Sequence, residues 1–500
     1  MLEICRQLFT QWNSHSVSYC HWKSNEHLLE GLNGETDLDV YVSPTDKEKA
    51  ETLLKKCFYI ECCTQKEHHY PNVFEWMGFD PTTGRLVHVH LHYQIITGTP
   101  FCKEYIFPVN DLIISTRVLD SETGVYVTNP NLEIILLHCR IALKAKNKLD
   151  IHLNKADQRE ISFLKERIEE DFVHNLCKML IGNNGDIFFS IISKKNLSCE
   201  EWNKLYLIAE GWLKPYRKYS KYHVFVRYHY YMLRKRVFRL AETKFHYHVI
   251  NKKTFPCSNL SICFIGQDGS GKSTITMELC KWFNWKLEAK RFYLGSGEHY
   301  SSTINNVLSK LSRIKNGEYL SKDNKKTKVT GFTKEKKKGI RSIFRSCISA
   351  YKMLGTAKNA YYEVRKADYY MRKGGIPLFD RFPQIQFEGI YDGPKIADTF
   401  INKGLDNFII RWMAKKEYRF INKIQEYQPT LVFKLILSPE ESIRRKPYEN
   451  FNMVSKKHEI TELINFPNSE VYVVDATQEY KEELLYIKRL IWKKLVEINL

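Results

Sequence analysis

The segment 266–273 reads GQDGSGKS and directly follows the apolar run 260–265. It matches the pattern G-x-x-x-x-G-K-[ST], in which glycines let the backbone turn its N–H groups around a phosphate without a Cβ clash. The helix that begins near Gly271 would direct its positive end at the same anion. A strand, this loop and a helix in succession predict a parallel α/β sheet with a site for a nucleoside triphosphate.

The side chains of this loop have distinct expected roles. Lys272 is expected to reach the outer phosphates as a catalytic group, and Ser273 to give an oxygen to a magnesium ion. The expected cofactors are therefore ATP and Mg²⁺, with nucleotide contacts along the whole loop. The predicted cofactor-binding residues are Gly266, Gln267, Asp268, Gly269, Ser270, Gly271, Lys272, Ser273 and Thr274.

After residue 259, short apolar runs alternate with longer helical stretches. This alternation predicts an α/β fold: a doubly wound parallel sheet with helices on both faces. The predicted strands are 260–265, 291–294, 376–379, 430–437 and 471–474.

Two later strand ends carry charged side chains. The segment GGIPLFDRFP places Asp380 and Arg381 at the carboxyl edge of a central strand, where ligands bind in such sheets. Asp380 is expected to orient magnesium-bound water or activate an acceptor hydroxyl, and Arg381 to hold a phosphate, unless they form an ordinary surface pair. Further on, LILSPEESIRRKPYEN carries Arg444 and Arg445, which suit a lid that closes on phosphoryl charge.

In their order and spacing, DGSGKST, DRF, PEESIRRK and VVDA resemble the thymidylate kinase-like branch of P-loop nucleotide kinases, over roughly residues 258–500. The chain departs from that family at YLGSGEHY (293–300), where a thymidylate kinase has an arginine-containing acceptor loop. The acceptor is therefore expected to be a nucleotide or a small hydroxylated metabolite. The resemblance assigns ATP and magnesium to Lys272 and Ser273, the acceptor side to Asp380 and Arg381, and the lid to Arg444 and Arg445.

The segment GLNGETDLDVYV (31–42) is a second chemical motif. Asp37 and Asp39 alternate with apolar residues, so both carboxylates lie on one face of a strand, where a divalent cation would relieve their repulsion. A glycine-bearing turn followed by Asp-x-Asp resembles the nucleotidyltransferase superfamily, which implies an α+β N-terminal domain. Where that superfamily has a third acid, LVHVHLHY (86–93) puts three histidines on one face, and His90 is the predicted third metal ligand. Active nucleotidyl transfer, a remodelled metal or ligand site and a structural hairpin all stay open.

A composition shift near residue 210 predicts three parts: a nucleotidyltransferase-like domain (1–210), a basic amphipathic helical connector (211–256) and a P-loop kinase-like domain (257–500). The connector has one apolar stripe at helical spacing. Such a helix would pack on a domain, lie on an anionic bilayer or bind nucleic acid. The residues of the stripe are Val226, Tyr230, Leu233, Val237 and Leu240.

The net charge of +20 is concentrated in two stretches. Residues 214–253 hold twelve Lys/Arg and one acid, and residues 321–350 hold ten Lys/Arg and two acids. Each is either a solvated surface or a site for a polyanion, namely nucleic acid, an anionic membrane or an acidic polymer. The lysine-rich segment 322–338 is predicted to be a mobile loop or insertion. A homodimer is also left open.

No apolar run approaches the roughly 18 residues of a membrane span. The first residues lack the apolar core of a signal peptide, and the thirteen cysteines show no zinc-binding spacing. The expected location is therefore cytoplasmic, with a peripheral position at the inner face of the membrane left open.

The leading functional hypothesis is an ATP-dependent kinase that phosphorylates a nucleotide or small hydroxylated metabolite. Fusions of this appearance suggest surface-polysaccharide synthesis by analogy. Two alternatives stay open: a nucleic-acid end-processing kinase and nucleotidyltransferase, and an ATP-gated peripheral membrane or scaffold protein.

Overall fold

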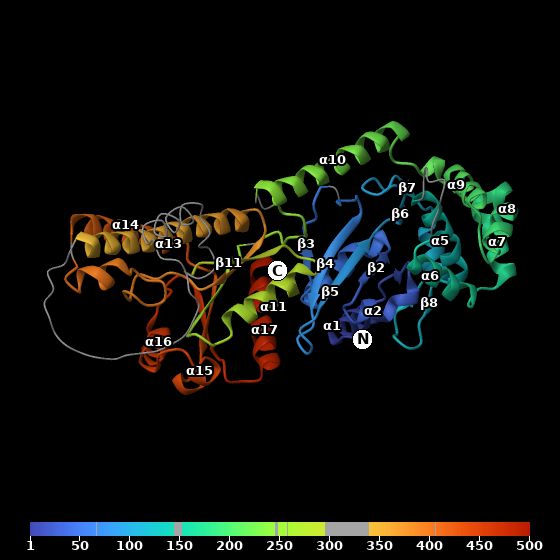
Figure 1. Cartoon of the computed structure of the whole chain (residues 1–500). Coiled ribbons are helices and arrows are strands. Elements are labelled where there is room, and N and C mark those ends of the chain that lie inside the picture. Colours follow the sequence, from blue (N-terminus) through green and yellow to red (C-terminus); the bar gives the residue numbers. More distant parts are fainter. Residues whose placement is uncertain (67, 145–152, 246–248, 258, 296–339, 406) are drawn as a thin grey trace, which may run out of the picture. The chain divides into compact units, whose positions relative to one another are not determined.

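The structure is a computed structural model of the 500-residue chain (Figure 1), and it describes all residues except 67, 145–152, 246–248, 258, 296–339 and 406. The segment 322–338 lies outside the described residues, as does much of the basic stretch 321–350.

Contacts divide the chain into two units. Unit 1 comprises Met1–Cys257, Trp285–Glu288 and Leu485–Leu500, and unit 2 comprises Ser258–Asn284 and Ala289–Leu484. The three domain limits given by the sequence stay a prediction.

Unit 1 contains a mixed sheet with the strand order β3-β4-β5-β2-β1-β9-β8. Strands β2 and β5 run parallel, so that Asp37 lies opposite His88 and Asp39 opposite His90, while β4 runs antiparallel to β5 and places Glu75 opposite His90. Residues that pair across strands share a face, so these polar side chains gather on one face of the sheet. The strands of unit 1 are β1 (Tyr19–His21), β2 (Asp37–Val42), β3 (Ile60–Cys62), β4 (Val73–Phe79), β5 (Leu86–His92), β8 (Val118–Leu119) and β9 (Tyr126–Val127), with a separate pair β6 (Ile96–Thr97) and β7 (Tyr105–Ile106).

The opposite face of this sheet is apolar. Leu38, Val40 and Val42 alternate with the aspartates of β2 and are fully buried in a cluster that includes Leu8 and Trp12 of α1. One face therefore anchors the sheet, and the other is left for polar chemistry. The helices that precede α5 are α1 (Glu3–Ser14), α2 (Leu28–Leu32), α3 (Lys47–Lys56) and α4 (Asn110–Thr116).

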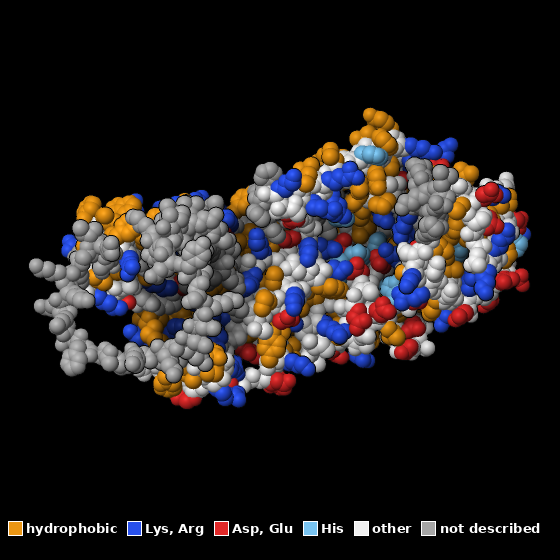
Figure 2. Space-filling view, in the orientation of Figure 1, with side chains coloured by type: hydrophobic (Ala, Val, Ile, Leu, Met, Phe, Trp, Pro, Cys, Tyr) orange, Lys and Arg blue, Asp and Glu red, His pale blue; other side chains and the backbone are white. Residues whose placement is uncertain are grey.

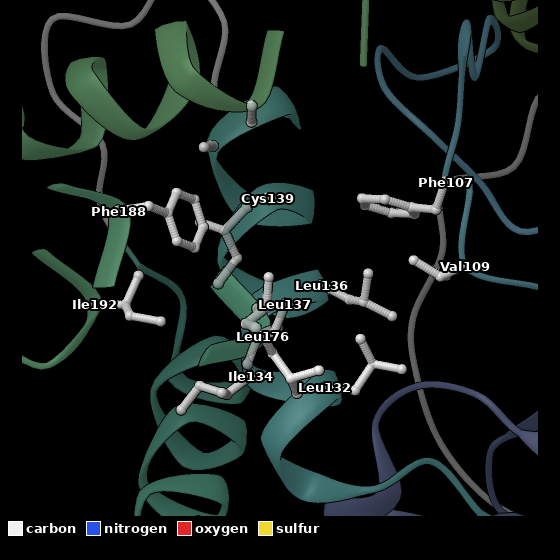
Figure 3. Packing of buried hydrophobic residues seen from close by; sticks show 14 of the residues in the cluster. Phe107, Val109, Leu132, Ile134, Leu136, Leu137, Cys139, Leu176, Phe188 and Ile192 are labelled. Carbon is white, nitrogen blue, oxygen red and sulfur yellow. The ribbon is translucent and has the colours of Figure 1, made fainter. Parts of the chain in front are cut away.

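A second core surrounds α5 (Pro130–Lys144), in which residues 131–143 are all buried. Figure 3 shows Leu136 facing Phe107 on one side of this helix, with Phe188 on the other side. In the structure this apolar stretch forms the centre of a helical core. The helices packed with it are α6 (Lys155–Lys165), α7 (Glu170–Ile181), α8 (Gly185–Ile192) and α9 (Cys199–Leu213); α10 (Lys221–Phe245) follows.

Unit 2 contains a five-stranded sheet with the order β11-β12-β10-β13-β14, and every pair is parallel. Every residue of β10 and β12 is buried, and because successive strand residues point to opposite faces, both faces are covered. The predicted parallel α/β sheet is confirmed, although the first strand begins two residues later and the second two residues earlier than predicted. The strands are β10 (Ile262–Gly266), β11 (Ala289–Tyr293), β12 (Ile376–Asp380), β13 (Leu431–Ile436) and β14 (Glu470–Asp475).

Among the described residues, the α-helices of unit 2 are α11 (Lys272–Asn284), α13 (Ile340–Arg372), α14 (Phe408–Ile424), α15 (Pro439–Arg445) and α16 (Phe451–Leu463), and α17 (Tyr480–Asn499) continues into unit 1. Among the described residues, no helix is both long and apolar enough to cross a membrane.

Candidate functional site

The phosphate loop joins the carboxyl end of β10 to the start of α11, as its sequence predicts. Gly271 has a φ of 89°, a conformation that favours glycine. At Gly266 an added Cβ would lie 2.5 Å from the carbonyl oxygen of Leu435. Within the loop, Gln267 and Ser270 are buried, while Ser273 and Thr274 are exposed at the first turn of the helix. The two glycines therefore allow the loop to close tightly over strand β13.

Lys272 is held inside the loop. Its ammonium group donates hydrogen bonds of 2.7 Å to the carbonyl oxygens of Gly266 and Gln267. Burial, and then the charge of Arg381, lower the pKa of Lys272 to about 7. A phosphate that enters the loop would provide the counter-charge that this ammonium group lacks.

Asp380 ends β12 and is fully buried. Its Oδ2 accepts hydrogen bonds of 2.6 Å from Ser273 Oγ and from Arg291 Nη2, while its Oδ1 has no hydrogen-bond partner among the described residues. A hydroxyl and a carboxylate side by side, with an unpaired buried oxygen, fit a hard divalent cation such as Mg²⁺. Arg291 comes from β11 and was not predicted, since the pairing of β11 with β12 brings it here.

Arg381 follows Asp380 with a φ of 75°, a left-handed conformation that a non-glycine residue rarely adopts. Its Nη2 lies 3.1 Å from Asp268 Oδ1, and Asp268 also forms an ion pair with Lys457. Burial would raise the pKa of Asp268, but Lys457, Lys272 and Arg381 outweigh it and lower the pKa to about 2. The loop aspartate thus holds two cations at the mouth of the site.

These groups line a cavity of about 260 Å³. Its lining contains four cationic side chains, against the carboxylates of Asp268 and Asp392. This excess of positive charge suits a polyphosphate. The four cations are Lys272, Arg381, Lys395 and Lys457, of which the sequence predicted the first two.

The two predicted lid arginines lie at the end of α15, and only one of them reaches the loop. Arg445 donates to the carbonyl oxygens of Gly269 at 3.3 Å and Ala476 at 3.0 Å. Arg444 is 78% exposed and pairs with Glu441 on its own helix. In this structure, therefore, Arg445 contacts the phosphate loop and Arg444 points to solvent.

A larger cavity of about 470 Å³ shares Asp392 and Lys395 with the first. Its lining combines Ser349, Thr356 and small apolar side chains of α13 with the buried Glu417 of α14. Glu417 accepts hydrogen bonds from the backbone N–H groups of Lys395 and Ile396, which fixes the segment between the two cavities. The sequence did not reveal this cavity, since its residues come from distant segments of the chain.

The polar face of unit 1 carries a row of alternating imidazoles and carboxylates. Glu75 Oε2 lies 2.6 Å from His88 Nε2 and 2.8 Å from His90 Nε2. Glu75 is the acid that sequence reasoning missed: it is the single charged residue in the otherwise apolar strand β4, and that contrast was the available signal.

The two aspartates of β2 extend this row. Asp37 Oδ1 lies 2.7 Å from His88 Nδ1, and Asp39 Oδ1 lies 3.2 Å from His90 Nδ1 and 3.3 Å from His92 Nε2. The structure therefore brings the three predicted metal ligands Asp37, Asp39 and His90 together. Two sets of three side chains are close enough to hold a metal ion: Asp37, His88 and His90, and Asp39, His90 and His92.

Two lysines also neutralise these carboxylates. Lys286 Nζ lies 2.6 Å from Asp37 Oδ1, and Lys23 Nζ lies 2.9 Å from Asp39 Oδ1. Burial would lower the pKa of His90, but Glu75 and Asp39 raise it to about 9. A metal ion at this face would therefore have to displace a lysine or a proton from its carboxylate partner.

No family model matches the chain. It is 27% identical over 228 residues to YghR of Escherichia coli K12, named an uncharacterized ATP-binding protein, covering 45% of this chain and 83% of that protein. It is 25% identical over 226 residues to YghS of the same strain, which bears the same description, covering 45% of this chain and 88% of that protein. Among solved structures, it is similar to deoxyadenosine kinase from M. mycoides with bound dATP, at 15% identity and a TM-score of 0.27 over 47% of this chain and 99% of that one.

Proposed function

We propose that unit 2 is an ATP-dependent kinase of the P-loop type, acting on a nucleotide or a small hydroxylated metabolite. The observation that carries this proposal is the phosphate loop, with Lys272 buried inside it and the Ser273–Asp380 pair at its edge. The two curated relatives, both named ATP-binding proteins, support the nucleotide. Surface-polysaccharide synthesis remains a setting suggested by analogy.

In this proposal each side chain has one task. Lys272 exchanges its loop carbonyls for the outer phosphates of ATP, and Arg381 and Lys457 hold charge at the mouth of the cavity. Ser273 and Asp380 would hold Mg²⁺, which when bound neutralises phosphate charge. The acceptor would lie in the 470 Å³ cavity, with its hydroxyl directed to the shared boundary at Asp392 and Lys395.

Phosphate transfer from labelled ATP tests this proposal, with a panel of thymidylate, other nucleotides, sugars, polyols and 5′-hydroxyl oligonucleotides. The wild type is compared with Lys272→Ala, and with Lys281→Ala as the control, because Lys281 is exposed on the same helix and pairs only locally with Glu278. A small molecule labelled by the wild type and Lys281→Ala, but not by Lys272→Ala, supports the kinase.

The other outcomes favour the open alternatives. A labelled oligonucleotide would favour nucleic-acid end processing. ATP binding without any labelled acceptor would favour an ATP-gated scaffold.

A second candidate function belongs to unit 1. We propose that the row of imidazoles and carboxylates binds a divalent transition metal, because imidazole ligands suit such ions better than they suit Mg²⁺. A remodelled nucleotidyltransferase site would have this composition. Whether nucleotidyl transfer persists depends on whether the ion displaces Lys23 and Lys286.

Calorimetric titration with Mn²⁺, Zn²⁺ and Mg²⁺ tests this second proposal, with the wild type compared with His90→Gln. His174→Gln is the control, because His174 lies on α7 and pairs with the exposed Asp186. Loss of Mn²⁺ or Zn²⁺ binding in His90→Gln alone would support the metal centre. Unchanged metal binding would identify the row as a structural ion-pair network.

A further inference from the structure

The apolar stripe of α10 is exposed to solvent. Large side chains of this kind are usually buried, and here they follow one side of the helix for about four turns. The exposed fractions are 46% for Val226, 59% for Tyr230, 62% for Leu233, 51% for Val237 and 51% for Leu240.

The opposite side of α10 packs on unit 1. Val224 is buried, Arg227 Nε donates a hydrogen bond of 3.2 Å to the carbonyl oxygen of Phe101, and the ring of Phe101 contacts Tyr228 and Tyr231. At about 100° per residue, these anchoring positions lie on the far side of the helix from the stripe. The contacts of α10 with its own unit therefore hold the stripe outward.

Basic side chains surround the stripe. Residues 214–253 hold twelve Lys/Arg and a single acid, Glu242, and Figure 2 shows blue basic groups beside orange apolar groups along α10. Arg236 and Lys244 are both exposed; at about 100° per residue Arg236 lies beside the stripe and Lys244 lies in line with it, one turn beyond Leu240. A partner for this surface must offer both an apolar environment for the stripe and negative charge for the basic side chains, only a few ångströms apart.

We propose that α10 lies flat on an anionic phospholipid bilayer, with the stripe inserted among the acyl chains and the basic side chains that flank it at the headgroups. Long basic side chains can lie along an apolar surface and still reach phosphate, and tyrosine suits the interface. Nucleic acid fits less well, because Leu233, Val237 and Leu240 offer nothing to a phosphate backbone. This inference is independent of the proposed function of unit 2.

Vesicle co-sedimentation of the full chain tests the proposal. The vesicles are phosphatidylcholine alone, or phosphatidylcholine mixed with phosphatidylglycerol. The wild type is expected to sediment with the mixed vesicles only, and less so at high salt. Leu233→Asp with Val237→Asp should weaken this binding by more than about tenfold, since two inserted side chains become charged.

The control is Leu207→Asp, because Leu207 is an equally exposed leucine on α9, outside the stripe. It should bind vesicles like the wild type, and circular dichroism should show all variants folded. Arg236→Gln with Lys244→Gln should retain the fold and lose the preference for anionic lipid.

Three results would overturn the proposal: a wild type that ignores anionic vesicles, a double aspartate variant that binds them unchanged, or a stripe that instead mediates a dimer or oligonucleotide binding. Light scattering and an oligonucleotide shift assay on the same variants would detect the last case.

Discussion

The two polar sites of this chain handle buried charge in opposite ways. Among the described residues of unit 2, the hydrogen-bond partners of Lys272 Nζ are two backbone carbonyls and the Ser270 hydroxyl, and one buried oxygen of Asp380 has no hydrogen-bond partner. In unit 1, Asp37 and Asp39 each have both a histidine and a lysine partner. The phosphate loop is therefore prepared for an external anion and cation, while the face of unit 1 is already close to neutral.

The two sites therefore differ in whether the protein itself or a bound ligand compensates a buried charge. An unpaired buried charge destabilises a fold by several kcal/mol, so it persists where a ligand will compensate it. The positive excess around the 260 Å³ cavity fits that description. A metal ion that binds in unit 1 would instead replace a lysine or a proton at the carboxylates. We therefore expect weaker ligand binding in unit 1 and a larger contribution of its polar face to the stability of the fold.

Asp380→Asn should give the largest effect. The amide keeps the size of the side chain but loses the charge that faces Ser273 and Arg291. Phosphate transfer should fall by roughly a thousandfold, while ATP binding measured by calorimetry stays within a few-fold. Equal losses in transfer and ATP binding would show that Asp380 serves the loop structure instead.

Glu75→Gln should give the next largest effect, this time on stability. It removes the carboxylate between His88 and His90, and breaking a buried ion pair from one side costs about 3 kcal/mol. Urea unfolding measures this change. Glu35→Gln is the control, because the Glu35–Arg85 pair is exposed and should change the free energy of unfolding by less than about 1 kcal/mol. A similar small change in both variants would contradict a structural role for the row.

These two residues also show what the sequence could reveal. Asp380 was predicted because a contiguous pattern, an apolar run followed by charge, marks the carboxyl end of a strand. Glu75 was missed because its role depends on the antiparallel register of β4 against β5, which places it opposite His90. The same holds for Lys457, which reaches Asp268 from a helix 189 residues away along the chain.

The connector shows a different limit of sequence reasoning. Periodicity correctly predicted a helix with an apolar stripe, now seen as α10. Periodicity does not say which face the domain covers, and here the covered face is the one that bears Val224, Tyr228 and Tyr231. The sequence pattern determines which residues share a face of the helix, and tertiary packing determines which face is buried.

Arg445→Ala and Arg444→Ala should separate the two predicted lid residues. Arg445 contacts the loop carbonyl of Gly269, so its loss should raise KM for ATP by about tenfold. Arg444 pairs only with Glu441 among the contacts described for it, and its loss should change KM by less than about twofold. Steady-state kinetics of both variants measures this. Equal effects would indicate a lid closure that brings Arg444 to the phosphates.

The smallest expected effect concerns Glu133, a second buried glutamate of unit 1, whose surroundings differ from those of Glu75. The charge of His90, with His88, holds the pKa of Glu75 well below its usual range against burial. Glu133 accepts hydrogen bonds from Asn25, and burial and then the like charge of Glu160 raise its pKa to about 7. The surroundings of Glu75 therefore stabilise its ionised form, whereas the surroundings of Glu133 destabilise its ionised form.

The sign of the pH dependence of Glu133 follows from this pKa. Below pH 4.5 the Glu133 carboxyl is protonated in both the folded and the unfolded state, so its raised pKa does not change the free energy of unfolding. Between pH 4.5 and about 7 the folded state binds more protons than the unfolded state, so the free energy of unfolding falls as pH rises. Glu133→Gln should abolish that fall. The net gain at pH 8 should be only about 1 kcal/mol, because the new amide cannot accept both bonds from Asn25. Urea unfolding at pH 4.5 and pH 8 measures it, and a variant that keeps the wild-type pH dependence would assign the ionisation to another group.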